Sequence, residues 1–251
     1  SAEAEAQRSA MLSFLTGSRG SGSLRKSLER GRRASSGRAG SISPTSLLPA
    51  GGPVTPFPGA LSPEYQHIAR SEEEVSFLVA SVPPPRRMED WVLLYSTARD
   101  GLSLRTLLRH AQGKGPCLLL IEDSQGAAFG TYTSERWRRG QRGESYGTGE
   151  CFVFALRPSG PRAWRWSGNN YIFQSSGADG QLGLGGGRHF ALWLQATTGG
   201  LCGSSGACET FNSPCLSASP DFDVRRCELW GFGSGVCSKG GHSPRSPRLS
   251  A

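Results

Sequence analysis

At least six short apolar segments follow one another between residues 151 and 232, separated by glycine, asparagine, proline or serine. They are CFVFAL, RAWRW, NYIFQS, HFALWLQA, GLCGS and RRCELWGF. Aromatic or β-branched segments of this length, with turn residues between them, are typical of antiparallel strands. Strands and helices do not alternate, which disfavours a doubly wound parallel sheet. The sequence therefore predicts a mainly β fold with short helices, arranged as a two-sheet antiparallel β-sandwich flanked by a few helices.

The segments before residue 151 predict the short helices and three more strands. Ser71 precedes three glutamates in SEEEVSFLVASVP, a pattern that predicts a capped helix start and a favourable helix dipole. The prolines at 83–85 should end that helix. WVLLYST predicts a buried strand, and the leucine spacing in SLRTLLRHAQG predicts a helix that stops at glycine. PCLLLIEDSQGAAFGTYTS predicts two strands joined by a turn at 123–126.

The positive charge of this chain is confined to its two ends. The net charge is +8, but residues 61–232 hold 17 basic and 17 acidic side chains. A nucleic-acid-binding fold carries its basic face on the folded part, so we expect no nucleic acid to bind the core. Residues 1–62 are basic and rich in serine, glycine and proline, and with residues 234–251 they are predicted to be disordered. Residues 63–233 are predicted to form one domain.

The N-terminal region leaves two questions open. We expect a cytoplasmic protein, but residues 11–50 are basic and poor in acidic residues, as transit peptides are, so import into a mitochondrion or another organelle is the alternative. Ser35 follows two arginines and is a candidate kinase site.

Gly147 and Gly149 in ESYGTGECFVF resemble a phosphate-binding loop only superficially. A phosphate cradle requires a strand, a glycine-rich turn and then a helix whose N–H groups face the anion. Here the glycines lead into CFVF, which is strand-like, and the glycines of GLGGGRHFALWL also lead into a strand. We therefore predict a structural turn or bulge rather than a nucleotide site.

No group of residues predicts a catalytic or metal centre. A Cys208–His189 nucleophile pair is one alternative, and a structural histidine is the favoured one. The six- and seven-residue spacings of Cys202, Cys208 and Cys215 are too long for a typical zinc site. The sequence therefore predicts no catalytic residue, no cofactor and no metal.

Two further polar groups have ordinary explanations. Glu122-Asp123 and Asp221 with Asp223 fall at predicted turns, where solvated acids are common. RAWRW alternates arginine with tryptophan, which suits an aromatic–basic stacking platform. An edge strand with its aromatic side chains inward and its arginines outward is the simpler explanation.

Seven cysteines, an odd number, and no Cys-x-x-Cys motif indicate reduced thiols rather than a disulfide framework. Three of them, Cys117, Cys151 and Cys227, lie in apolar strands, where burial raises a thiol's pKa. The other four lie in glycine-, serine- or proline-rich stretches and are candidates for exposed thiols: Cys202, Cys208, Cys215 and Cys237.

A further set of side chains is predicted to form the core, because polar neighbours flank them on strand or helix faces. They are Tyr95, Leu104, Phe129, Phe152, Phe154, Trp166, Phe173, Trp193, Phe211, Leu229 and Trp230.

Seven stretches together resemble the TLDc domain, shared by oxidation-resistance proteins and their relatives. In order, they are WVLLYSTARDGLSLRTLLR, LLLIEDSQGAAFGTYTS, SYGTGECFVFAL, WRWSGNNYIFQSS, GLGGGRHFALWL, CETFNSPCLS and FDVRRCELWGF, and they span about residues 63–232. The resemblance implies a compact two-sheet sandwich, protection against oxidative stress and, for several relatives, binding to the vacuolar proton ATPase. It implies no settled catalytic mechanism.

The chain departs from the family pattern at a few places. Gln195 stands where an acidic residue is usual, Leu108 replaces the family's tyrosine, and Ser213-Pro214 replaces the usual second asparagine. Residues 195–207 are glycine-rich and off-pattern. If a partner contacts that segment, these differences put its binding to this chain in doubt.

These observations favour a protein-binding module that protects against oxidative stress, with the vacuolar proton ATPase as a candidate partner. The alternative is a redox-active thiol scavenger or an enzyme acting on peroxide, which requires an exposed, low-pKa thiolate beside a cation.

Overall fold

The structure, a computed structural model, describes residues 66–138, 144–177 and 180–233. The predicted disordered regions 1–62 and 234–251, with Ser35 and Cys237, lie outside these residues. Within the described ranges, no helix is both long enough and apolar enough to cross a membrane.

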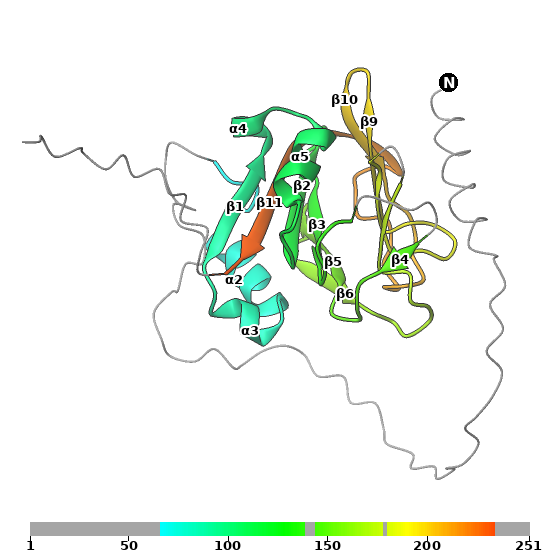
Figure 1. The fold of residues 1–251 in the computed structure, drawn as a ribbon. Coiled ribbons are helices and arrows are strands. Elements are labelled where there is room, and N and C mark those ends of the chain that lie inside the picture. The colour runs from blue at the N-terminus through cyan, green and yellow to red at the C-terminus, as the bar shows by residue number, and fades with distance from the viewer. Residues whose placement is uncertain (1–65, 139–143, 178–179, 234–251) are drawn as a thin grey trace, which may run out of the picture. The chain divides into compact units, whose positions relative to one another are not determined.

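Eleven antiparallel strands form one sheet in the described part of the chain (Figure 1). They are β1 (Trp91–Ser96), β2 (Cys117–Asp123), β3 (Ala128–Thr133), β4 (Ser145–Tyr146), β5 (Phe152–Arg157), β6 (Arg162–Arg165), β7 (Gln174–Ser176), β8 (Leu182–Leu184), β9 (Leu192–Thr197), β10 (Gly200–Ser204) and β11 (Asp221–Phe232). Their spatial order is β4-β7-β8-β9-β10-β11-β2-β3-β5-β6, and β1 pairs with β11. The prediction of a mainly β fold with short helices is confirmed.

The expected division into two separate sheets is not confirmed, because β11 belongs to both halves of one curled sheet. Residues 221–223 of β11 pair with β10, residues 224–231 pair with β2, and residues 228–232 pair with β1. The strand therefore joins the two halves by backbone hydrogen bonds. The short strands β4 and β8, of two and three residues, have no repeating apolar pattern of their own and were not predicted.

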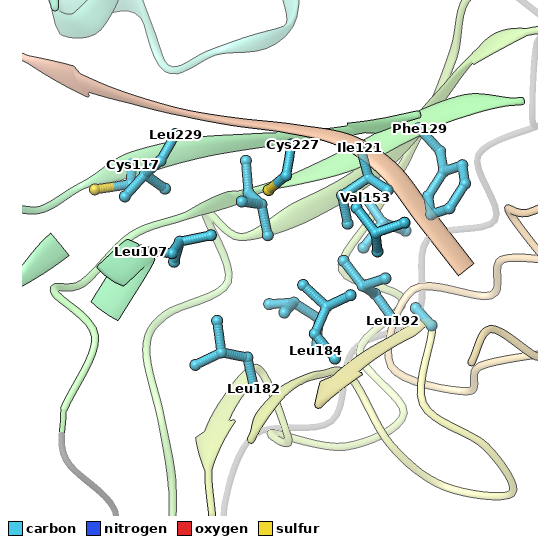
Figure 2. Packing of buried hydrophobic residues seen from close by; sticks show 14 of the residues in the cluster. Leu107, Cys117, Ile121, Phe129, Val153, Leu182, Leu184, Leu192, Cys227 and Leu229 are labelled. Carbon is cyan, nitrogen blue, oxygen red and sulfur yellow. The ribbon is translucent and has the colours of Figure 1, made fainter. Parts of the chain in front are cut away.

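The main hydrophobic cluster lies between the two halves of the sheet (Figure 2). Ile121, Phe129 and Val153 point from one half toward Leu184 and Leu192 on the other. A second cluster on the opposite face of the sheet packs against the helix of residues 72–81 and includes Leu78, Trp91 and Trp230. Ten of the eleven predicted core side chains are buried, and the exception, Trp166, is half-buried against the main cluster.

The helices are short. They are α2 (Glu72–Ser81), α3 (Pro84–Arg87), α4 (Thr97–Asp100) and α5 (Leu104–Ala111). Helices α2 and α5 begin where the sequence predicts, whereas α3 and α4 were not predicted. The Ser71 hydroxyl accepts the Glu74 N–H at 3.1 Å, and the Glu74 carboxylate accepts the Ser71 N–H at 3.4 Å, which forms a capping box. The prolines end α2 as expected, and Pro84 then begins α3, because a first-turn position needs no N–H.

The prediction that Glu122 and Asp123 are solvated was wrong. The Asp123 carboxylate is fully buried and accepts N–H groups from Gln125, Ala127 and Ala218 at 2.9–3.0 Å. Glu122 is 1% exposed and pairs with Arg70 and Arg157. The residues do lead into a turn, but the chain around 218 and the N-terminal segment cover them. Asp221 and Asp223 are exposed, as predicted, but they lie in strand β11 rather than at a turn.

Candidate functional site

Three loops that connect strands of the sheet are hydrogen-bonded to one another. They are residues 166–173 between β6 and β7, residues 185–191 between β8 and β9, and residues 205–220 between β10 and β11. We call the surface formed by residues 166–173, 185–191 and 206–213 the three-loop surface. Parts of three stretches that carry the family resemblance meet here.

Thr210 is the centre of this network and is completely buried. Its hydroxyl lies 2.7 Å from the Asn170 Oδ1 atom and accepts the Gly186 N–H at 2.9 Å. Its carbonyl oxygen accepts the Ser167 N–H at 2.8 Å. One side chain and its backbone therefore connect all three loops.

The neighbours of Thr210 add further hydrogen bonds between the loops. The Glu209 carbonyl oxygen accepts the Ser167 hydroxyl at 2.6 Å and the Asn169 side-chain amide at 3.3 Å. The Glu209 N–H donates to the Gly186 carbonyl oxygen at 3.2 Å. The Trp166 indole N–H donates to the Asn170 carbonyl oxygen at 2.7 Å. These contacts hold the loop backbones in one arrangement and so pre-organise the surface above them.

Because Gly185 has no side chain, its backbone can lie close to the Cys208 sulfur. Its φ is +71°, and a Cβ at this position would lie 2.4 Å from the Cys208 Sγ atom. Any other residue would be strained and would collide with that sulfur. The glycines of GLGGG therefore have the structural role that the sequence predicts.

The outer side of the three-loop surface presents an aromatic and two charged side chains. Tyr171 is 72% exposed and stacks at a tilt on Trp166, with 5.2 Å between ring centroids. The Arg188 Nε atom lies 3.7 Å from the Glu209 Oε1 atom; the Arg188 side chain is 84% exposed and that of Glu209 is 49% exposed. Tyrosine, tryptophan and arginine are the residues that most often dominate binding energy at protein interfaces.

The structure does not form the Cys208–His189 nucleophile pair. Cys208 is buried, with its Sγ atom 3.5 Å from the Gly186 carbonyl oxygen, whereas His189 is exposed. Among the described residues, no hydrogen bond joins the two side chains. No group of histidine, cysteine and acidic side chains in these ranges has the geometry to hold a metal ion.

More cysteine side chains are buried than the sequence predicts. The predicted burial of Cys117, Cys151 and Cys227 is confirmed, and burial raises the pKa of each thiol, that of Cys117 to about 12. The expectation that Cys202 and Cys208 are exposed was wrong. Cys202 lies within β10, between the strands β9 and β11, and the Cys208 sulfur lies against Gly185 and Gly186 of the three-loop surface. Cys215 is half-buried, and its Sγ atom lies 3.5 Å from the Ser217 hydroxyl.

The structural explanation of one motif is confirmed, and that of a second is confirmed in part. Gly147 has a φ of +98°, and the strand β5, not a helix, follows the glycines at 147 and 149. The RAWRW segment forms β6, which ends the strand order, so the predicted edge strand is confirmed. The predicted division into inward aromatic side chains and outward arginines was wrong, because Arg162 lies over the Trp164 ring on one face and Arg165 lies over the Phe152 ring on the other. Sequence reasoning missed Thr210 and Asn170, whose only signal was a polar residue within a stretch of the family resemblance.

Known proteins resemble this chain over nearly all of the described part. Residues 64–233 match the family model of the TLDc domain. Over 161 residues, the chain is 38% identical to oxidation resistance protein 1 of Xenopus laevis and 37% identical to that of Homo sapiens, a stretch that covers 64% of this chain and 18% of each relative. Over 144 residues, it is 39% identical to nuclear receptor coactivator 7 of Homo sapiens, which covers 57% of this chain and 15% of that protein. The matched part thus spans less than a fifth of these relatives.

Proposed function

The chain belongs to the TLDc domain family, and from that premise we propose that it is a protein-binding module that acts in protection against oxidative stress. The relatives named oxidation resistance protein 1 support the cellular role. The three-loop surface supports the molecular one, because a pre-organised loop surface with exposed tyrosine and arginine binds a partner without a large ordering cost.

The observation that carries this proposal is the contrast between the buried hub and the exposed outer side chains. Thr210 is inaccessible and holds three loops together, while Tyr171 and Arg188 stand above it in solvent. A loop network with this many hydrogen bonds between its segments favours a fixed recognition surface over a mobile lid.

The burial of the thiols argues against the scavenger alternative. A peroxide-reactive cysteine needs an accessible thiolate, and burial stabilises the neutral thiol instead. Five of the six described cysteines are buried. Cys215 is the remaining accessible thiol within the described ranges, and its sulfur contacts serine oxygens rather than a cation.

The partner that the family resemblance supplies is the vacuolar proton ATPase. We propose that the three-loop surface contacts an exposed protein subunit of that assembly. Tyr171 would supply the central apolar contact, and Arg188 with Glu209 would form the polar rim.

The test is affinity capture from native lysate with the full chain as bait. We expect the tagged chain to capture ATPase subunits, and the double change Tyr171→Ser with Arg188→Glu to reduce capture at least tenfold. Both side chains are exposed, so the variant should keep the wild-type unfolding midpoint. Arg105→Glu, a charge reversal at an exposed position on α5, is the matched control and should capture normally.

A peroxide assay separates this proposal from the scavenger. The change Cys215→Ser with Cys237→Ser should leave cellular survival in peroxide unaltered. Catalytic peroxide consumption by the wild type, lost together with survival in that variant, would establish the scavenger instead. Equal capture by the Tyr171 variant and the wild type would rule out the three-loop surface.

A further inference from the structure

One edge of strand β6 is unpaired in the part of the chain that the structure describes. Among the described residues, β6 pairs only with β5, in the register Phe152–Arg165 to Ala155–Arg162. Alternate backbone N–H and C=O groups of a strand face each side, so the outer groups of β6 are open to pairing. A free edge is a template for another extended chain unless side chains discourage it.

Two arginines are fixed beside this edge by the end of helix α2. The Arg165 guanidinium donates to the Ser81 carbonyl oxygen at 2.7 Å and lies over the Phe152 ring, 5.0 Å from its centroid. The Arg87 guanidinium donates to the Ala80 and Val82 carbonyl oxygens at 2.8 and 3.0 Å. Three consecutive carbonyl groups at the end of α2 thus hold both cations in place.

These cations lack a partner carboxylate among the residues that the structure describes. Neither Arg87 nor Arg165 forms an ion pair there, and burial, followed by the positive charge of Arg87, lowers the pKa of Arg165. On the other face of β6, the exposed Arg162 lies over the Trp164 ring at 5.3 Å, and within the described ranges it forms no ion pair with a carboxylate. Residues 61–232 have no net charge, so the positive charge at β6 is a local feature of this edge and does not reflect an overall positive domain.

We propose that β6 is a docking edge for an acidic, extended segment of a partner protein, which adds to the sheet as a further strand. The backbone of that segment would pair with the outer groups of β6. Its carboxylates would lie beside Arg87 and Arg165 on one face and beside Arg162 on the other. Main-chain pairing supplies affinity in such complexes, and alternate side chains supply specificity.

The free backbone edge favours a peptide over other anionic ligands. An anionic membrane or a nucleic acid would satisfy the guanidinium groups, but neither presents a strand to the N–H and C=O groups of β6. The inference rests on the proposed function, because the edge leads directly into the loop of residues 166–173, and one partner can contact both.

The test uses the full chain and two synthetic peptides, one with glutamate alternating with threonine and one with lysine in place of glutamate. We expect fluorescence anisotropy to show binding of the glutamate peptide only. Amide hydrogen exchange should slow at the outward N–H groups within residues 162–165. Arg162→Glu should weaken binding at least tenfold, and Arg87→Glu with Arg165→Glu should weaken it further.

The Arg162→Glu variant separates loss of binding from loss of folding. Arg162 makes no hydrogen bond to α2, so its charge reversal should leave the unfolding midpoint unchanged. Arg105→Glu on α5 is the control for non-specific charge effects and should bind normally. Failure of the glutamate peptide to bind, binding without protection of β6, or equal loss with Arg105→Glu would overturn the proposal. Protection of β6 by phosphatidylserine vesicles but not by the peptide would also overturn it.

The two proposals fail separately. If the chain captures its partner through Tyr171 but charge reversal at β6 changes nothing, only the docking edge is wrong. If the peptide binds β6 but the lysate yields no partner that depends on Tyr171, the three-loop surface is wrong and the docking edge remains.

Discussion

Gly147 shows how a single residue without a side chain fixes the path of the chain into β5. Its φ of +98° is unfavourable for any residue with a Cβ, and a Cβ there would lie 2.9 Å from the Gln174 Oε1 atom and 3.3 Å from the Phe173 Cβ atom. We predict that Gly147→Ala lowers the free energy of unfolding by about 1–3 kcal/mol, from backbone strain and crowding together. Urea unfolding with a constant slope measures this.

A second glycine isolates the contribution of strain. Gly160 has a φ of +86°, and a Cβ there would meet no atom within 4 Å. Gly160→Ala should therefore cost only about 1 kcal/mol, the backbone strain alone. If both variants lose the same free energy of unfolding, the atoms around Gly147 accommodate the added Cβ without a further loss of stability.

At the scale of an element, α2 depends on its first turn. The Ser71 hydroxyl satisfies the Glu74 N–H, and three glutamates face the positive end of the helix. Ser71→Ala should lower the free energy of unfolding by about 1 kcal/mol, whereas Ser71→Asn, an equally good cap, should change it little. Thermal and urea unfolding of the three proteins give the comparison, and an asparagine variant as unstable as the alanine variant would contradict the capping role.

At the scale of the whole molecule, buried tyrosines and thiols predict a loss of stability in alkali. Burial raises the pKa of each group in this set: Tyr95 and Cys117, each to about 12, and Tyr132, Tyr146, Cys151 and Cys227. The ordinary values are 9.0 for cysteine and 10.0 for tyrosine, so the unfolded chain loses these protons first. The folded state binds more protons over this range, and the free energy of unfolding must therefore fall as the pH rises from about 9.

Urea unfolding between pH 7 and pH 11 measures this slope. Each group that is ionised only in the unfolded state contributes about 1.4 kcal/mol per pH unit. Cys117→Val removes one such group from the core and should make the decline shallower by up to that amount. Stability that is constant or rising up to pH 11 would show that these groups ionise without unfolding the protein.

The sequence by itself determined the local structure. Caps, prolines and leucine spacing predicted α2 and α5, because these signals act within a few residues of one another. Apolar segments between turn residues predicted most strands and ten of eleven core side chains, because burial follows the side-chain pattern of each element. The glycines at 147 and 185 were correctly assigned structural roles, since a strand and not a helix follows them.

Only the tertiary structure decided the properties that depend on distant segments. Asp123 lies beside a turn, yet residue 218 supplies one of its hydrogen bonds, so its burial was invisible locally. Cys208 lies in a glycine- and serine-rich segment, yet Gly185 and Gly186 cover its sulfur. Thr210 joins three loops whose residues are up to 43 positions apart in the sequence, 167 to 210. Whether a polar side chain is solvated, reactive or a structural hub is set by neighbours that the chain brings together only on folding, whereas secondary structure is set largely by neighbours along the chain.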